Sequence, residues 1–261
     1  MGIKTTIKKE QLPLKYQKYN LIETTNGNTD SVYLLNDKYV VKLYENTILE
    51  TIKNEQKLLN QLQDLKVPKC IEIFQIKDKI VAIFTQINGN SIEKPTINHI
   101  KQIGIFLKGF HNISQNLTSS NTQIYSKKYL KSLITKSKNT ILKQHFDDIN
   151  IDIELKNDGI IHGDIFYDNA KFLDNSLSGV YDFTEACIGD FKFELAVVAI
   201  SWCFDGDILN TEKLNTLLSS YGLDIKYDDF KIYINYALLY YSIIRDLDNR
   251  DYQDLLDKIL F

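Results

Sequence analysis

Short apolar stretches separated by polar turns fill the first third of the chain and predict β-strands. The predicted strands cover residues 18–25, 31–36, 38–44, 71–76 and 80–85. Between residues 45 and 65 the apolar positions recur instead at close to a helical period, and Pro68 ends this segment. The pattern therefore predicts three strands, a helix and two further strands.

The rest of the chain is predicted to be mostly helical. Residues 88–90 (N-G-N) break the apolar pattern and predict a connection between two parts of the molecule. The predicted helices are residues 97–113, residues 124–147 and most of the chain after residue 190, with interruptions near residues 206 and 222. A chain of 261 residues suits two such parts, so we expect domains at residues 1–87 and 88–261.

Composition narrows the classes of function. A formal net charge of −3 and a pI of about 5.9 do not favour nucleic acid or an anionic membrane as a partner. Cys70, Cys187 and Cys203 show no metal-binding or redox spacing and fit free thiols in a reducing compartment. The polar N-terminus has no signal-peptide core and no apolar run is as long as a membrane span, so we expect a cytoplasmic protein without a membrane partner.

The segment from residue 160 to residue 183 carries the chemistry. It contains His162, Asp164 and Asn169, and Asp182 follows the apolar run at residues 177–181. Asp164 precedes Asn169 by five residues, which is the spacing of the catalytic loop of protein kinases. Phosphoryl transfer needs one carboxylate that orients the attacking hydroxyl, and an amide oxygen and a second carboxylate that hold Mg²⁺. The spacing therefore predicts a phosphotransferase.

These residues resemble the aminoglycoside phosphotransferase and choline kinase superfamily. The stretches L-S-G-V-Y-D-F-T-E-A-C, S-W-C-F-D-G-D-I-L-N and V-K-L-Y-E are similar to the bacterial homoserine kinases of that superfamily. The resemblance implies an α+β, bilobal protein-kinase-like fold. Residues 1–87 would be an N-terminal nucleotide-binding lobe with a small antiparallel sheet, and residues 88–261 a mostly helical catalytic and substrate-binding lobe.

The resemblance also implies roles for the central residues. Asp164 would be the catalytic base that orients the acceptor, and His162 would brace the loop. Asn169 and Asp182 would be the Mg²⁺ ligands, since both offer the hard oxygens that this ion prefers. Asp182 is followed by Phe-Thr rather than Phe-Gly, which matches small-molecule kinases and argues against a protein substrate. Glu194 stands where the superfamily usually has aspartate.

Nucleotide binding is predicted from the first domain. Lys42 lies on a predicted strand before a helix that carries Glu55, so Lys42 would contact the nucleotide phosphates with Glu55 as its partner. Lysine at this point is typical of the wider superfamily rather than of the homoserine kinases. Gly27 lies either in a phosphate-covering loop or in a plain hairpin turn. By resemblance, Thr85 would offer its carbonyl and Ile87 its amide to the adenine.

The acceptor-binding residues are less sharply indicated. Homoserine is a zwitterion, so a cation must hold its carboxylate and an acidic group its ammonium. Arg245 is a candidate for the carboxylate, with a helix salt bridge to Asp246 or Asp248 as the alternative. Glu185 and Asp205 are candidates for the ammonium, with helix capping as the alternative.

These features together predict an ATP- and Mg²⁺-dependent kinase acting on the hydroxyl of a small amino-bearing metabolite, with homoserine as the first choice. An aminoglycoside, choline, ethanolamine or an amino sugar is the alternative acceptor. A catalytically inactive nucleotide-binding pseudokinase is a remote alternative, which the intact Lys42, Asp164, Asn169 and Asp182 oppose. The sequence leaves open whether ATP or GTP is preferred and whether the protein is a monomer or a homodimer.

Overall fold

The computed structural model describes residues 2–24, 29–148 and 153–260, and the chain forms two units. The small unit consists of Met1–Gly89 and the later segment Ser178–Thr184. The large unit consists of Asn90–Leu177 and Glu185–Phe261. Gly27, the residue predicted to lie in a phosphate-covering loop, is outside the described residues.

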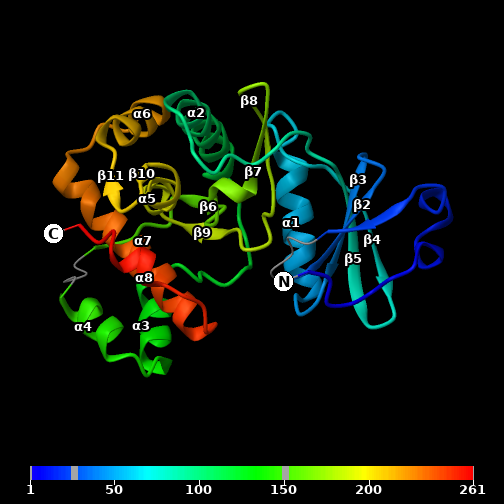
Figure 1. Cartoon of the computed structure of the whole chain (residues 1–261), viewed down its shortest axis with the longest axis horizontal. Helices are drawn as coiled ribbons and strands as arrows, with labels where there is room; N and C mark the ends of the chain where they lie inside the picture. Colours follow the sequence, from blue (N-terminus) through cyan, green and yellow to red (C-terminus); the bar gives the residue numbers. More distant parts are fainter. Residues whose placement is uncertain (1, 25–28, 149–152, 261) are drawn as a thin grey trace. The chain divides into compact units, whose positions relative to one another are not determined.

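The small unit is built on one antiparallel sheet (Figure 1). Its strands are β1 (Leu21–Glu23), β2 (Ser31–Leu35), β3 (Tyr39–Tyr44), β4 (Cys70–Ile76) and β5 (Lys79–Thr85). They are arranged in the order β1-β2-β3-β5-β4, with every neighbouring pair antiparallel. This confirms the predicted small antiparallel sheet, and the strands begin and end within a few residues of the predicted positions.

The two faces of β3 have different roles, because successive side chains of a strand point to opposite faces. Val41 and Leu43 are fully buried in a cluster with Ile7, Leu12 and other apolar residues of the N-terminal segment. That segment forms two short 3-10 turns, Lys9–Gln11 and Leu14–Tyr16. Lys42 alternates with these core residues, so its side chain lies on the other face of the sheet.

Helix α1 (Leu49–Gln61) covers that other face with a buried stripe that includes Ile52, Glu55 and Leu58. It is shorter at both ends than the predicted helix at residues 45–65. Glu45, in the predicted first turn, instead accepts hydrogen bonds from Thr5 and Ser31, which hold it outside the helix. The tertiary contacts of Glu45 therefore override the local helical pattern.

The large unit is mostly helical. Its helices are α2 (Ile97–Ser114), α3 (Lys127–Lys136), α4 (Thr140–Asp148), α5 (Phe191–Trp202), α6 (Thr211–Tyr221), α7 (Tyr227–Leu247) and α8 (Gln253–Leu256). Short strand pairs accompany these helices: β6 (Gly159–Ile161) with β9 (Cys187–Gly189), and β10 (Phe204–Asp205) with β11 (Ile208–Leu209). A third pair joins β7 (Ala170–Leu173) to β8 (Ser176–Val180), and from Ser178 onwards β8 is part of the small unit. None of the helices in the described ranges is both long and apolar enough to cross a membrane.

Helix α5 forms the centre of the large unit. Nine of its 12 residues are buried, and it packs against both α6 and α7. A helix that is apolar on all sides is stable only when other elements surround it. Asp190 caps its first turn by accepting hydrogen bonds from the amides of Lys192 and Phe193.

The segment predicted as one helix at residues 124–147 is two helices, α3 and α4. The break lies at Ser137, whose ψ of 138° is extended. The Ser137 hydroxyl donates to Asp246 Oδ2 over 2.8 Å, and the side-chain amide of Asn139 donates to Asp246 Oδ1 over 3.1 Å. Contacts with a residue on α7, more than 100 positions away, thus end a helix that the local pattern would continue.

Candidate active site

The predicted catalytic loop, residues 162–169, follows the buried strand β6 and is called the catalytic loop below. The side-chain amide of Asn169 donates to the backbone carbonyl of Asp164 over 2.7 Å and to its carboxylate Oδ2 over 2.9 Å. Asn169 ends a 3-10 turn, Tyr167–Asn169, that brings it back towards Asp164. The structure therefore joins the two residues that the sequence spacing singled out.

The buried side chain of Glu194 on α5 holds the start of the catalytic loop. Its Oε1 accepts hydrogen bonds from the backbone amides of His162 (2.7 Å) and Gly163 (2.8 Å). His162 is fully buried, and its Nδ1 accepts from the amide of Asp164 over 3.2 Å. This geometry is suited to bracing the loop, which is the role predicted for His162.

Large aromatic residues hold the loop from other directions. The hydroxyl of Tyr241 on α7 donates to the carbonyl of Gly163, and Trp202 Nε1 donates to the carbonyl of Ile165 over 2.9 Å. Gly163 has a φ of +81°, and a Cβ there would lie 2.2 Å from the ring of Tyr125. The position therefore requires glycine for both its backbone conformation and the close approach of the ring.

Lys42, in the small unit, is surrounded by acceptors. Its Nζ lies 2.7 Å from Asp182 Oδ1 and 2.7 Å from the hydroxyl of Thr184. Asp30 Oδ2 lies 3.5 Å away. The predicted partner Glu55 is linked to Lys42 through Thr184, whose hydroxyl lies 3.4 Å from Glu55 Oε2. The segment after β8 therefore supplies the polar groups nearest to Lys42.

Opposite charges dominate the electrostatics around Lys42. Burial alone lowers the pKa of Lys42, but the negative charges of Asp182 and its carboxylate neighbours outweigh burial and raise that pKa. Burial raises the pKa of Glu55, and the positive charge of Lys42 opposes this rise. Lys42 is thus held in its charged form, which is the form that attracts nucleotide phosphates.

Asp182 has a backbone conformation that is uncommon for a residue with a side chain. Its φ of +68° lies in the left-handed region, where aspartate and asparagine are tolerated better than most residues. Such conformations often accumulate at functional sites, because the surrounding structure must hold them in place. The ion pair with Lys42 is one of the contacts that fix Asp182 here.

Glu185 is the predicted acceptor-binding residue that the structure brings next to the catalytic loop. The hydroxyl of Tyr125 donates to Glu185 Oε2 over 3.0 Å, while the ring of Tyr125 covers Gly163. Burial raises the pKa of Tyr125 well above its ordinary value, and the charges of Glu185 and Asp164 add to this rise. The negative charges of Glu185 and Asp164 therefore both raise the pKa of the same buried phenol, that of Tyr125 beside the loop.

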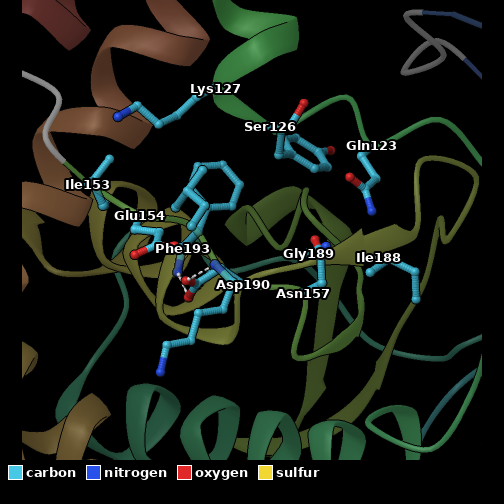
Figure 2. Close-up of a pocket in the computed structure, with 13 residues that line it drawn as sticks. Gln123, Ser126, Lys127, Ile153, Glu154, Asn157, Ile188, Gly189, Asp190 and Phe193 are labelled. Carbon is cyan, nitrogen blue, oxygen red and sulfur yellow. Dashed lines mark hydrogen bonds between the residues drawn. The ribbon is translucent and has the colours of Figure 1, made fainter.

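Tyr125 also lines a cavity of about 490 Å³ within the large unit. Figure 2 shows the residues that line this cavity as sticks. The lining comes from the start of α3, the segment before β6 and the turn from β9 into α5. Its residues are Gln123, Tyr125, Ser126, Lys127, Ile153, Glu154, Leu155, Lys156, Asn157, Ile188, Gly189, Asp190 and Phe193. The volume is that of a small-molecule site, and the lining mixes apolar groups with charges of both signs.

The other predicted acceptor-binding residues already have partners. Arg245 Nη1 donates to Asp254 Oδ1 on α8 over 2.7 Å, rather than to the predicted alternatives Asp246 or Asp248. Asp205 lies 2.5 Å from Lys213 Nζ and also accepts from Asn210 over 2.8 Å. The hydrogen bond from Asn210 makes the largest contribution to lowering the pKa of Asp205, and the hydrogen bond from Lys213 lowers it further.

In the predicted adenine-binding segment, Thr85 ends β5 and Ile87 lies two residues further along the chain. The Thr85 hydroxyl accepts from the amide of Lys69 over 2.9 Å, and the backbone groups of the same two residues also pair. These bonds fix the end of β5 to the start of β4. The adenine contacts of Thr85 and Ile87 stay a prediction, as do the roles of the other site residues.

Sequence reasoning missed several groups at this site. In the small unit, Thr184 contacts Lys42. In the large unit, Tyr125 contacts Glu185, and Tyr241 contacts the carbonyl of Gly163 in the catalytic loop. His111 contacts Glu194, which in turn holds the amide of His162. Thr184 could have been found, because it directly follows Asp182 and Phe183. The two tyrosines and the histidine carry no local signal, since they reach the loop from helices and turns distant in sequence.

The chain matches the family described as the phosphotransferase enzyme family over residues 21–221, and it belongs to that family. The match includes the whole catalytic loop together with Lys42 and Asp182. The enzyme class is that of a small-molecule kinase. This confirms both the resemblance stated from the motifs and the predicted class of enzyme.

Among curated relatives, homoserine kinases are prominent. The homoserine kinase of Bartonella tribocorum is 28% identical over 223 residues, which cover 77% of this chain and 66% of that protein. The homoserine kinase of Methylorubrum populi is 24% identical over 251 residues, covering 85% of this chain and 78% of the relative. The chain thus spans about two thirds to three quarters of these relatives.

Solved structures of aminoglycoside phosphotransferases share the fold. The GDP and kanamycin complex of APH(2")-IIia matches with a TM-score of 0.69 at 16% identity, over 92% of this chain and 90% of that one. The gentamicin complex of APH(2")-IIa matches with a TM-score of 0.65 at 21% identity, over 94% and 91%. The predicted α+β, protein-kinase-like fold class is confirmed.

Proposed function

We propose that this protein transfers the γ-phosphoryl group of ATP, with Mg²⁺, to the hydroxyl of a small amino-bearing metabolite, and that homoserine is the acceptor. The observation that carries the proposal is the pair of hydrogen bonds from Asn169 to the carbonyl and carboxylate of Asp164. They hold the carboxylate of Asp164, the residue that the sequence spacing predicts to orient the attacking hydroxyl. Orientation matters most here, because phosphoryl transfer depends on alignment and charge stabilisation more than on base strength.

Asp164 would accept the hydrogen bond of the acceptor hydroxyl and align its oxygen with the γ-phosphorus. As the new oxygen–phosphorus bond forms and the bond to the β-phosphate oxygen breaks, the hydroxyl proton passes to Asp164. Glu194 and Tyr241 would hold the loop during this step, because they bind its backbone from two sides. The product would be a phosphate ester together with ADP.

The small unit supports the nucleotide half of the proposal. Lys42, held in its charged form, would contact the phosphates, with Asp182 and Thr184 around it. Residues 1–87 would therefore be the nucleotide-binding lobe and residues 88–261 the catalytic and acceptor-binding lobe. The GDP bound in the structural relatives is consistent with a nucleotide donor in this fold.

Each of the two predicted ligands, taken by itself, offers an oxygen of the kind that suits a magnesium ion. The side-chain nitrogen of Asn169 is engaged with Asp164, so its oxygen is the atom that is available to a metal. Asp182 offers a carboxylate, and oxygen donors of both kinds suit Mg²⁺, which keeps several water ligands. When bound, the ion would neutralise charge on the phosphates. Within the described part of the chain, no group of three or more His, Cys, Asp or Glu side chains is arranged to hold a metal by itself.

An amino-bearing acceptor fits the surroundings of Asp164. The negative charges of Glu185 and Asp164 both raise the pKa of the Tyr125 phenol. A cationic group of the acceptor placed near that phenol would therefore be attracted by two carboxylates. The homoserine kinases among the relatives make homoserine the first candidate. Aminoglycosides are the second candidate, because the structural neighbours include complexes with kanamycin and gentamicin.

An acceptor screen tests the proposal. ADP formation from ATP and Mg²⁺ is followed with homoserine, choline, ethanolamine and an aminoglycoside in separate reactions, and the product is identified by its mass. Asp164→Asn, prepared in the same way, controls for a contaminating kinase. Turnover of homoserine that Asp164→Asn abolishes is expected. Turnover of another acceptor alone would replace homoserine but keep the kinase assignment, and no turnover with any acceptor would overturn the proposal.

A further inference from the structure

A buried histidine lies behind the catalytic loop. His111 on α2 is only 2% exposed, and its Nε2 lies 2.5 Å from Glu194 Oε2. Its Nδ1 lies 2.8 Å from the hydroxyl of Tyr221 at the end of α6. The imidazole is stacked on Phe191, with 3.8 Å between the ring centroids and 6° between the planes. The orientation of the imidazole ring is therefore fixed by stacking on one face and by a polar contact at each of its two nitrogens.

Tyr221 offers a hydrogen-bond donor to one ring nitrogen of His111. Burial raises the pKa of the Tyr221 phenol, and the charge of Glu194 raises it further, so the phenol stays protonated. Its hydroxyl can then donate to Nδ1 of a neutral imidazole. With Nδ1 as the acceptor from Tyr221, Nε2 bears the hydrogen and can donate to Glu194 Oε2.

Both oxygens of the Glu194 carboxylate have hydrogen-bond partners. Its Oε1 accepts from the amides of His162 and Gly163, and its Oε2 accepts from His111. The side chain has no solvent exposure, so a lost donor cannot be replaced by bulk water without a rearrangement. A glutamate also has three rotatable bonds, and a contact at only one oxygen would leave its carboxylate free to turn.

We propose that His111 is a positioning residue for phosphoryl transfer. By donating to Glu194 Oε2 it keeps Glu194 Oε1 on the two amides of the catalytic loop. These two amides in turn position the backbone of Asp164, which directly follows Gly163 in the chain. The effect on turnover rests on the proposed function, whereas the effect on the loop amides does not.

Two variants of equal polarity separate this role from packing. In His111→Gln the side-chain amide reaches about as far as Nε2, so it can still donate to Glu194. In His111→Asn the amide reaches only about as far as Nδ1, so it can meet Tyr221 but not Glu194. His99→Asn is the matched control, because His99 lies on the same helix, is 4% exposed and contacts Asn175 instead of the loop.

Three quantities are measured on the full chain of each variant. The first is hydrogen exchange at the amides of residues 162 and 163, which reports the contact with Glu194 directly. The second is kcat with saturating substrates, and the third is the dissociation constant for ATP with Mg²⁺. Thermal unfolding shows whether each variant is folded.

We expect His111→Asn to speed exchange at the two amides by about ten-fold or more, because a partner of Glu194 is lost. It should lower kcat by about ten- to a hundred-fold with the ATP dissociation constant unchanged, because a small displacement of the reacting groups slows transfer strongly. His111→Gln should stay close to wild type in both quantities, and His99→Asn should leave both unchanged.

Unchanged exchange in His111→Asn overturns the proposal, as does a kcat equal to that of wild type. A loss of kcat in His99→Asn as large as in His111→Asn also overturns it, because the effect would then be one of general packing. If wild type turns over no acceptor, the proposed function fails, and the exchange data still decide whether His111 holds the loop.

Discussion

Lys42 Nζ lies 2.7 Å from Asp182 Oδ1, although the two residues are 140 positions apart in the chain. Asp182 reaches this place because the segment after β8 belongs to the small unit. The pair has two consequences. It holds Lys42 in its charged form, and it places a predicted metal ligand beside the residue predicted to contact the phosphates.

The first prediction concerns Asp164. We expect Asp164→Asn to lower kcat by about 10²–10⁴-fold while ATP still binds, because the variant loses the group that orients and accepts the proton. Steady-state kinetics and calorimetric titration with an ATP analogue measure the two effects. A variant that keeps more than about a tenth of the wild-type rate would contradict the assigned role.

The second prediction concerns the metal. Asn169→Ala and Asp182→Ala should each weaken binding of a non-hydrolysable ATP analogue in the presence of Mg²⁺ and have less effect without it, because each removes an oxygen ligand. Calorimetry with and without Mg²⁺ measures the difference. Asp168→Ala, the neighbouring carboxylate in the loop, is the control. Equal binding by wild type and both variants would place the metal elsewhere.

The third prediction concerns the acceptor ammonium. Glu185→Gln should raise KM for an amino-bearing acceptor and leave KM for ATP little changed, because it removes a negative charge beside Tyr125. Loss of one charge-assisted contact corresponds to about 1.5–3 kcal/mol, or about ten- to a hundred-fold in kcat/KM. Asp205→Asn is the comparison, since Asp205 is already paired with Lys213. An equal effect of the two variants would remove Glu185 from the site.

The fourth prediction concerns the acceptor carboxylate. Arg245 lies four residues after Tyr241, which contacts the loop, so both lie on the same side of α7. If Arg245 grips the carboxylate of homoserine, Arg245→Lys should raise KM for homoserine by about ten-fold or more, because lysine lacks the planar two-bond grip. Arg250→Lys is the matched control, as Arg250 is the other arginine and is paired with Asp248. Unchanged homoserine kinetics would leave Arg245 as the partner of Asp254 alone.

The fifth prediction concerns stability. Gly163→Ala should destabilise the fold and abolish turnover, because a Cβ at this φ of +81° would lie 2.2 Å from the buried ring of Tyr125. Gly206→Ala has a similar φ of +64° but nothing within 4 Å of the added Cβ, so it should cost only about 1–2 kcal/mol of conformational strain. Denaturant unfolding measures both. Equal losses in the two variants would show that the contact with Tyr125 is unimportant.

The sequence predicted the sheet well because its information is local. Apolar stretches and polar turns defined the five strands, and the spacing of Asp164 and Asn169 singled out two residues that the structure joins by hydrogen bonds. Both features depend on residues within a few positions of each other. The α+β kinase-like fold class followed from that local information together with the family resemblance.

The remaining features depend on partners that are distant in sequence. Helix α3 ends at Ser137 because of Asp246, and the catalytic loop is held by Glu194, which lies on α5. Tyr125 meets Glu185 across 60 positions, and His111 meets Glu194 across 83. A single sequence contains no periodicity that reports such pairs, so only the folded structure identifies them.

The division of the small unit between Met1–Gly89 and Ser178–Thr184 bears on how the protein is made. During synthesis the first segment leaves the ribosome well before the second. At about 5–20 residues per second, translation of the intervening stretch takes about 5–20 s. In that interval Lys42 and Glu55 lack both Asp182 and Thr184. The nascent N-terminal segment therefore carries an incomplete charge cluster until the second segment arrives, and a fragment ending at Gly89 would keep that defect permanently.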